Sequence, residues 1–194
     1  QFALDKITGD WLLFVDADER VLAPLKEEIE QLMKFKHEES AWAISRRNII
    51  FGQEVKYAAF WPDYVIRLFK SEQLKGYKGE VHEQPVFEGK LGYLKNSFLH
   101  LTHRDIESVM LKSLSWSKID AKLRLQANHP PMSSWRFLRL LFTELFEQGV
   151  RRKVFFNGTV GAMDALLQVF SLMLTYMRLW EMQQPTPLSD QYQQ

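Results

Sequence analysis

The chain has 194 residues, a length that suits one domain or one domain with an appendage. Hydrophobic residues make up 46% of it and aromatic residues 13%, which is enough for a buried core, and the formal net charge of +1 gives no global signal for nucleic-acid binding. The chain contains no cysteine, so disulfides and thiolate metal sites are excluded.

The N-terminal part reads as the end of a helix followed by a strand. Residues 1–8 look like the last turns of a helix that Gly9 terminates. Because the chain opens inside this helical pattern and without a methionine, we expect it to be a fragment whose preceding part is missing. Residues 11–15 are a short apolar run, which favours a strand buried on both faces over a buried helix.

Three carboxylates, those of Asp16, Asp18 and Glu19, follow this run directly. Acids at the carboxyl end of such a strand lie where open α/β sheets bind ligands. Carboxylate oxygens also suit hard cations such as Mg²⁺ or Mn²⁺. Asp16 and Asp18 would point to the same side of a continuing strand, or would splay around one cation if the strand ends there. The alternative is an ordinary acidic loop with no metal.

Further along, the pattern changes from one helix to a series of strands. Pro24 fits the first turn of a helix that runs to about Lys36. Strand character then recurs at residues 41–51, 54–58, 64–69 and 91–101. These segments predict an α/β fold with a mixed sheet.

The remaining residues are mainly helical. Residues 105–127 have helical periodicity with Asp105 as the N-cap, and a second helix is expected over residues 135–148, closed by Gly149. A strongly apolar segment follows, and the Gln- and Pro-rich tail is expected to be disordered. We therefore divide the chain into residues 1–104, with the sheet, residues 105–182, a helical appendage, and residues 183–194, the tail.

Two sequence pairs contain histidine. His82 and Glu83 lie among glycines, where Glu83 could be a general base for a substrate hydroxyl while His82 hydrogen-bonds to it or binds a phosphate. An ordinary polar loop is the simpler alternative. His100 and His103 would share a face if helical and could then ligate a metal. The alternative is one buried, hydrogen-bonded histidine and one exposed histidine.

Aromatic residues flank an acid at residues 60–64, where Trp61 lies next to Pro62 and Asp63. Aromatic rings pack on the C–H faces of sugars while a carboxylate binds hydroxyls, so Trp61 and Asp63 are candidate sugar-binding residues. A corner of the core is equally compatible with this pattern. Arg67 follows in an apolar strand context.

A basic, aromatic-rich helix is expected near the C-terminus. Its pattern favours a membrane-surface element, with core packing as the alternative. The longest clean apolar run, residues 165–177, still contains Gln168 and is shorter than the ~20 residues that span a bilayer. A buried helix, an interfacial helix and a hairpin that dips into one leaflet all stay open. The aromatic residues of the basic, aromatic-rich helix are Trp135, Phe137, Phe142 and Phe146, and the basic residues in it or just after it are Arg136, Arg139, Arg151, Arg152 and Lys153.

As an ordered set, these motifs resemble family 2 glycosyltransferases of the GT-A fold, in particular the subgroup that includes lipopolysaccharide-core glucosyltransferases. The resemblance runs over about residues 1–125 and more loosely to residue 181. It implies a truncated, Rossmann-related GT-A-like sheet over residues 1–104, with the strands that bind the nucleotide base missing. The matching stretches are residues 3–20, Trp61-Pro62-Asp63-Tyr64, Arg67-Leu68-Phe69, Gly79-Glu80-Val81-His82-Glu83 and Leu99-His100.

The resemblance also implies roles for individual residues. Asp18 would bind the divalent cation, Mg²⁺ or Mn²⁺, that bridges the donor phosphates, with Asp16 near the ribose and the metal, and His100 as a further ligand. The wider family often carries Glu-Asp where this chain has His82-Glu83, so the base is Glu83 or His82. Donor or acceptor contacts are implied for Asp16, Arg67, Trp61 and Asp63.

The implied enzyme is an inverting glycosyltransferase of the hexosyltransferase type. It would move a sugar from a nucleotide-sugar to a hydroxyl of a glycan or lipid-linked acceptor in lipopolysaccharide synthesis, peripherally at the cytoplasmic face of the membrane, with no nucleic-acid partner. A fragment without its donor half could be inactive alone. Two rivals stay open: another metal-dependent phosphoryl enzyme, and a non-catalytic membrane-associated interaction module.

Overall fold

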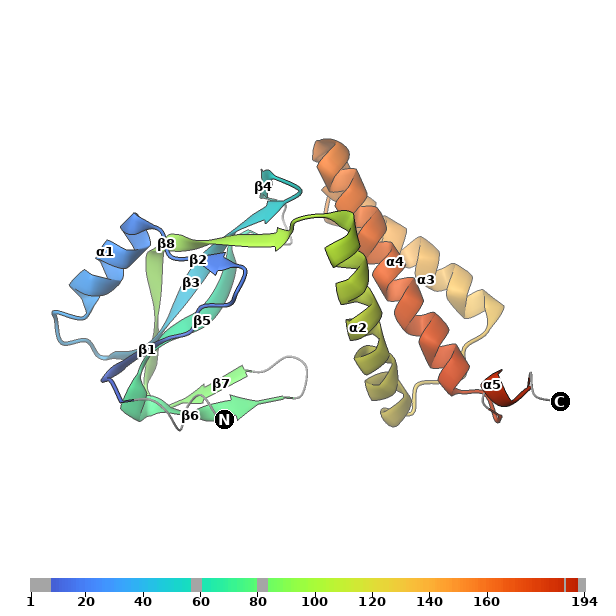
Figure 1. Ribbon diagram of the computed structural model, residues 1–194, viewed down its shortest axis with the longest axis horizontal. Helices are drawn as coiled ribbons and strands as arrows, with labels where there is room; N and C mark the ends of the chain where they lie inside the picture. Colours follow the sequence, from blue (N-terminus) through green and yellow to red (C-terminus); the bar gives the residue numbers. More distant parts are fainter. Residues whose placement is uncertain (1–7, 57–60, 80–83, 187, 192–194) are drawn as a thin grey trace. The chain divides into compact units, whose positions relative to one another are not determined.

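The computed structural model describes residues 8–56, 61–79, 84–186 and 188–191 (Figure 1). The chain divides into two compact units. Residues 1–49 and 54–102 form the first, which we call the sheet unit, and residues 50–53 and 103–194 form the second, the helical unit.

The sheet unit is built on a six-stranded sheet in which β1, β5, β3, β8 and β2 lie side by side in that order and β4 pairs with β3. Strand β5 is antiparallel to both β1 and β3, and β2 is antiparallel to β8. The strands are β1 (Trp11–Leu13), β2 (Glu19–Arg20), β3 (Glu39–Ile50), β4 (Gln53–Val55), β5 (Asp63–Lys70) and β8 (Lys90–His103).

Strands β3 and β8 run parallel. The Ser45 hydroxyl contacts the Ser97 hydroxyl at 2.6 Å, and further along both strands the Phe51 N–H donates to the His103 carbonyl at 2.7 Å. The contacts therefore advance in the same direction on the two strands. Parallel and antiparallel pairs together make the sheet mixed, which confirms the predicted α/β class and the mixed sheet.

The first strand differs from its prediction. Only Trp11–Leu13 is strand, it is half-buried, and it stands at one end of the strand order. The Phe14 N–H still donates to the Arg67 carbonyl at 2.9 Å, after which the chain turns toward β2. The run is apolar because Trp11 and Leu13 pack against the core of the sheet unit, while the Phe14 ring packs against Phe69 and Tyr77 at 5.9 and 5.4 Å between ring centroids. The strand thus has packing partners on both faces but is only half-buried, so the predicted full burial was wrong.

The core of the sheet unit lies between the sheet and helix α1 (Ala23–Leu32) (Figure 1). Pro24 occupies the first turn, as predicted, but the helix ends before Lys36. The His37 ring contacts the Leu32 carbonyl at 3.0 Å and caps the helix there. The buried residues that α1 and the sheet contribute are Leu25, Ile29, Trp42, Ile44, Leu68, Leu94 and Phe98.

A two-stranded antiparallel sheet completes the sheet unit. It consists of β6 (Leu74–Lys78) and β7 (Gln84–Phe87), and a 3₁₀ turn (Ser71–Gln73) connects β5 to it. The loop between β6 and β7 carries His82 and Glu83, which lie outside the described residues.

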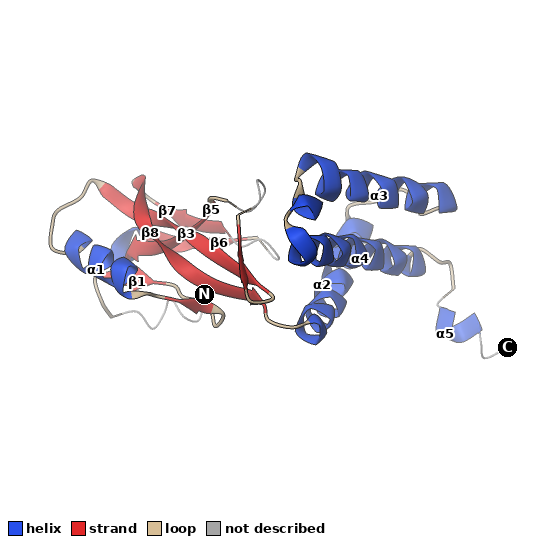
Figure 2. Ribbon diagram, turned by 90° about the horizontal axis from the view of Figure 1, so that it is seen from above, coloured by secondary structure: helices blue, strands red, loops and turns tan. Residues whose placement is uncertain are grey.

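The helical unit contains three long helices, with α4 lying between α2 and α3 (Figure 2). Asp105 caps α2 by accepting a hydrogen bond from the Ser108 N–H at 2.7 Å, which confirms the predicted N-cap. The elements are α2 (Ile106–Gln126), α3 (Ser134–Phe146), a π-helical turn (Glu147–Arg151), a 3₁₀ turn (Val154–Phe156), α4 (Gly158–Met182) and α5 (Leu188–Gln191).

Gly149 does not close the second predicted helix. It is buried in the π-helical turn, where a Cβ atom would come within 2.7 Å of the Phe155 ring. Glycine at this position permits close packing against Phe155. The π-helical turn continues past Gly149 and ends at Arg151.

Helix α4 is longer than the clean apolar run in the sequence suggests. It has 25 residues, and an 18-residue window within it has a mean hydropathy of 1.4 with 33% of that window buried. By length and composition it is the one helix among the described residues that could cross a membrane. Its packed side carries Tyr176 and Leu179, which are buried with Ala121 of α2 and Met132.

A core substitution tests the packing of the sheet against α1. We expect Phe98→Ala to lower the free energy of unfolding of the sheet unit by about 3–5 kcal/mol, because Phe98 is fully buried and its removal leaves a cavity. The matched control is Phe35→Ala, at a side chain that is 67% exposed, with an expected change within about 0.5 kcal/mol. Equal effects of the two variants in chemical denaturation would contradict this core assignment.

Candidate functional site

The acidic stretch after β1 forms a turn that hydrogen bonds hold in place. The Asp16 N–H donates to the Glu19 carboxylate at 3.0 Å, and the Glu19 N–H donates to the Asp16 carbonyl at 2.9 Å. The Leu101 N–H of β8 donates to the Asp18 carbonyl at 2.8 Å. The backbone of the turn is therefore fixed at both ends. The side-chain carboxylates of Asp16 and Asp18 take no part in these hydrogen bonds.

Asp16 and Asp18 take partners on different strands. The Asp16 carboxylate pairs with Arg67 of β5, whereas the Asp18 carboxylate lies 3.5 Å from Nε2 of His100 on β8. Of the two arrangements that the sequence leaves open, the structure has the one in which the strand ends and the two side chains splay. Both carboxylates stay accessible, with 51% of the Asp16 side chain and 36% of the Asp18 side chain exposed.

A buried carboxylate lies beneath this turn. The Glu19 side chain is fully buried, and its Oε1 atom has no hydrogen-bond partner among the described residues. Guanidinium nitrogens of Arg67 and Arg46 lie 3.6 and 3.8 Å from that oxygen. A buried carboxylate needs such partners because an unpaired charge in a low-dielectric interior is strongly unfavourable. Glu19 therefore links Arg46 and Arg67 under the exposed acids.

Arg46 is held by a second carboxylate, that of Asp63. Arg46 donates from Nε and Nη2 to the two Asp63 oxygens at 2.9 and 3.1 Å, an arrangement in which two parallel hydrogen bonds fix the planar group. The Asn48 side-chain amide also donates to Asp63, at 3.1 Å. Both Asp63 carboxylate oxygens thus accept hydrogen bonds from within the site, and Asp63 orients Arg46 and Asn48.

The hydrogen-bond network assigns the proton on His100. Because the Asn48 NH₂ group donates to Asp63, its carbonyl oxygen is the atom that faces His100, and that oxygen lies 2.6 Å from Nδ1. A carbonyl oxygen only accepts, so Nδ1 carries the hydrogen. In the neutral ring Nε2 then has a lone pair, and this is the nitrogen that faces Asp18.

The surroundings favour the neutral form of His100. Burial lowers the pKa of the imidazole below its ordinary value of 6.5, and the nearby charge of Arg46 lowers it further. The carboxylates of Asp18, Glu19 and Asp63 act in the opposite direction, with smaller effect. A neutral imidazole with its Nδ1–H fixed by a partner is the form in which histidine binds metals.

The donor set of Asp18 and His100 suits a divalent cation. One carboxylate oxygen and one imidazole nitrogen, with the exposed Asp16 carboxylate nearby in the same turn, offer ligands that Mn²⁺ accepts. Within the described ranges, no group of three or more acidic or histidine side chains is close enough to form a preformed metal cage. A cation held by Asp18 and His100 would complete its coordination shell with water or a bound ligand, because divalent cations take about six ligands.

The remaining candidate residues lie apart from this network or outside the described residues. Trp61 is 37% exposed, with the Lys56 ammonium group 5.1 Å from its ring centroid. His103 belongs to the helical unit and lies 3.5 Å from the buried Asp164. His100 and His103 both lie on β8, so the shared helical face considered for them is not formed. His82 and Glu83 fall outside the described residues.

Sequence reasoning missed Arg46, Asn48 and the buried role of Glu19. A signal for two of them exists in the sequence, because Arg46 and Asn48 are two residues apart in a predicted strand and must share a face. Two polar side chains that follow Trp42 and Ile44 on the same face of the strand indicate a polar site at that position. Their partners on β5 and β8 could not be read from the sequence.

The state of His100 can be measured directly. In an NMR titration we expect the His100 imidazole to have a pKa below 6.5, because it is buried and close to Arg46. The unfolded state then binds the proton more tightly than the folded state, so the contribution of His100 to the free energy of unfolding falls as the pH drops below 6.5. The denatured protein is the control. A folded-state pKa at or above the denatured value would contradict the assignment.

The chain is similar to three curated bacterial proteins, and no protein-family model matches it. It is 26% identical over 195 residues to the lipopolysaccharide core biosynthesis glycosyltransferase LpsC of Rhizobium meliloti. It is 23% and 24% identical over 191 residues to uncharacterized glycosyltransferases of Rickettsia conorii and Rickettsia felis. Each alignment covers 93% of this chain and 67% of the relative. These named homologues support a glycosyltransferase family for the chain.

Proposed function

We propose that the chain is part of an inverting family 2 glycosyltransferase of the GT-A fold. It moves a sugar from a nucleotide-sugar donor to a hydroxyl of a glycan or lipid-linked acceptor during synthesis of a cell-envelope polysaccharide. The observation that carries this proposal is the accessible Asp18 carboxylate 3.5 Å from Nε2 of His100, in the turn between β1 and β2. The similarity to glycosyltransferases over 93% of the chain supports it independently.

Asp18 and His100, with Asp16 nearby, hold a divalent cation against the donor diphosphate. When bound, the cation offsets the negative charge that develops on the leaving nucleoside diphosphate. His100 keeps its orientation through the hydrogen bond to Asn48, and Asn48 keeps its own through Asp63. These hydrogen bonds to Asn48 and Asp63 fix the direction of the Nε2 lone pair. Hydrogen-bond partners of a metal-binding histidine orient the ring in this way.

Asp16 and Arg67 form the second part of the donor site. Arg67 pairs with Asp16 at the surface of the turn, so its guanidinium group can exchange this partner for a phosphate oxygen when the donor arrives. Deprotonation of the acceptor hydroxyl falls to Glu83, with His82 as the alternative base, because an ordinary hydroxyl needs a base within hydrogen-bond reach.

The helical unit holds the enzyme at the cytoplasmic face of the membrane, where it meets lipid-linked acceptors. Helix α3 has no buried residue, and one of its faces is both apolar and exposed. Its exposed apolar side chains are Trp135 (71%), Leu138 (49%), Phe142 (66%) and Phe146 (60%). These positions are three or four residues apart, so they form one stripe along the helix. We call these four residues the α3 stripe.

Four of the five basic residues named with this helix fall into two groups. Arg151 and Arg152 both donate to the Glu147 carboxylate, at 3.1 and 3.0 Å, so their charge is partly offset within the chain. Arg136 and Arg139 lie on α3 itself beside the α3 stripe. A basic residue near an anionic membrane contributes about 1 kcal/mol, so the electrostatic part of binding is modest and the aromatic side chains supply the rest.

Substitution of Asp18 tests the proposed cation site. We expect Asp18→Asn to weaken binding of Mn²⁺, with uridine or guanosine diphosphate present, by about tenfold or more, measured by the electron paramagnetic resonance signal of free Mn²⁺. The fold should be kept, because the backbone carbonyl of Asp18, and not its side chain, bonds to Leu101. Loss of a charged ligand oxygen is the physical reason for the weaker binding.

The matched control for this experiment is Asp10→Asn. Asp10 is also an exposed aspartate beside β1, but it precedes the strand, whereas Asp16 and Asp18 follow it. This variant should bind Mn²⁺ as the unmodified protein does. If Asp18→Asn binds Mn²⁺ as well as Asp10→Asn does, the proposed site is wrong.

Vesicle flotation tests the proposed membrane surface. We expect the protein to float with vesicles of phosphatidylglycerol and phosphatidylcholine, and the double variant Trp135→Ser, Phe142→Ser to lose most of this binding. Raising the salt from about 0.1 M to about 1 M should weaken the binding only in part, since salt screens the arginines but not apolar insertion. Phe35→Ser, at an equally exposed residue of the sheet unit, is the control. Equal flotation of the two variants would refute the role of the α3 stripe.

A further inference from the structure

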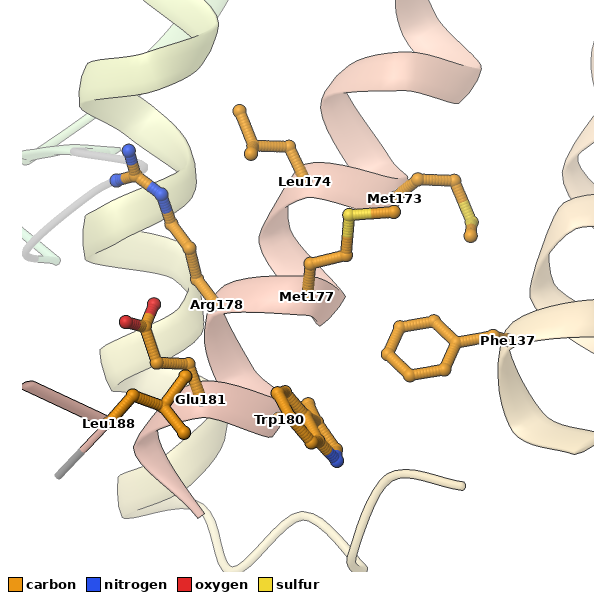
Figure 3. Close-up of a pocket in the computed structure, with 8 residues that line it drawn as sticks. All are labelled: Phe137, Met173, Leu174, Met177, Arg178, Trp180, Glu181 and Leu188. Carbon is orange, nitrogen blue, oxygen red and sulfur yellow. The ribbon is translucent and has the colours of Figure 1, made fainter. Parts of the chain in front are cut away.

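A large apolar groove runs along α4, with α3 as one wall (Figure 3). Its volume is about 640 Å³. In Figure 3, Phe137 of α3 reaches toward Met177 and Trp180 of α4. The groove is lined by Phe137, Met173, Leu174, Met177, Arg178, Trp180, Glu181 and Leu188. It belongs entirely to the helical unit, and the site in the sheet unit makes no use of it.

The lining chemistry selects an apolar occupant. Six of the eight lining residues are aromatic, aliphatic or methionine, and the two charged residues, Arg178 and Glu181, lie on the side of α4 away from Phe137. A sugar or a nucleotide would lose hydrogen bonds to water in such a groove without replacing them, which is unfavourable. Met173 and Met177 have flexible, polarizable side chains that adapt to an irregular or mobile apolar ligand.

The length of the groove matches an acyl chain. The lining residues of α4 run from Met173 to Glu181, eight steps that cover about 12 Å at 1.5 Å per residue. The hydrocarbon layer of one leaflet is about 15 Å thick, half of a ~30 Å core. One acyl chain that lies along α4 would therefore cover most of the apolar lining.

Charge and position favour a membrane lipid over other apolar occupants. Helix α3 forms one wall through Phe137, and the same helix carries the exposed α3 stripe with Arg136 and Arg139. Arg178 and Glu181 both lie at the margin of the groove, so the lining itself carries one positive and one negative group. From residue 133 to residue 182 the chain has six basic and four acidic side chains, an excess of two positive charges. An exposed apolar surface bordered by basic residues is complementary to an anionic bilayer.

We propose that the groove binds one acyl chain of an anionic membrane phospholipid, whose phosphate pairs with a basic residue at the groove margin. This inference rests on the surface association proposed above and does not require transferase activity. Binding of one acyl chain gives the helical unit a defined lipid contact in addition to insertion of the α3 stripe.

Photo-crosslinking from a labelled lipid tests this proposal. The full chain is incubated with phosphatidylglycerol–phosphatidylcholine vesicles in which the phosphatidylglycerol carries a diazirine at the end of one acyl chain, and labelled residues are mapped by mass spectrometry. We expect labelling of Phe137, Met173 and Met177. Labelling confined to the α3 stripe, in a protein that still floats with the vesicles, would overturn the groove and leave the surface association intact.

A blocking variant gives an independent readout. Met177→Trp fills the groove from a side chain that is 52% exposed, so the protein should fold and float, and groove labelling should fall several-fold. Met182→Trp is the matched control, because Met182 is also a partly exposed methionine of α4 but does not line the groove. Unchanged labelling of Met177→Trp would contradict the proposal. So would a dimer in sedimentation that dissociates in Met177→Trp, since a second copy would then be the occupant.

Discussion

The buried carboxylate of Glu19 is the constraint on which the arrangement of the site depends. Its Oε1 atom lies 3.6 Å from Arg67 and 3.8 Å from Arg46, while Oε2 accepts the Asp16 N–H. Because a buried charge must be paired, both guanidinium groups are drawn to this point of the sheet. Arg67 is then positioned to meet Asp16. Removing Glu19 would leave two arginines without their common partner, and the acidic turn would lose one of its two reciprocal hydrogen bonds.

A second chain of contacts carries this constraint to His100. Arg46 binds Asp63 through two hydrogen bonds, Asp63 accepts from Asn48, and Asn48 accepts from Nδ1 of His100. The order of donors and acceptors places a hydrogen on Nδ1, so in the neutral ring Nε2 is unprotonated and faces Asp18. Burial and Arg46 lower the pKa of His100 and so favour the same neutral form. Burial, hydrogen bonding and the charge of Arg46 thus favour the state that the proposed cation needs.

The two units contribute different chemistry to the proposed enzyme. The sheet unit offers hard oxygen and nitrogen donors on a turn that β8 fixes through Leu101 and Asp18. The helical unit offers exposed aromatic side chains and an apolar groove along α4. Polar phosphate chemistry and lipid contact need opposite surroundings, since one requires paired charges and the other requires surfaces without them. Because they lie in two separate units, each has the surroundings that it requires.

The sequence by itself determined the longer helices and strands and the location of the acids. Short-range patterns are sufficient for this, because the capping residue Asp105, the early proline of α1 and the strand periodicities act within a few residues. Only the tertiary structure decided that Asp16 meets Arg67, that Asp18 meets His100, and that Glu19 is buried. These contacts join residues about 30 to 80 positions apart in the chain, and sheet order and register set them. No local pattern encodes which strands pair, because pairing depends on how the whole sheet buries its apolar faces.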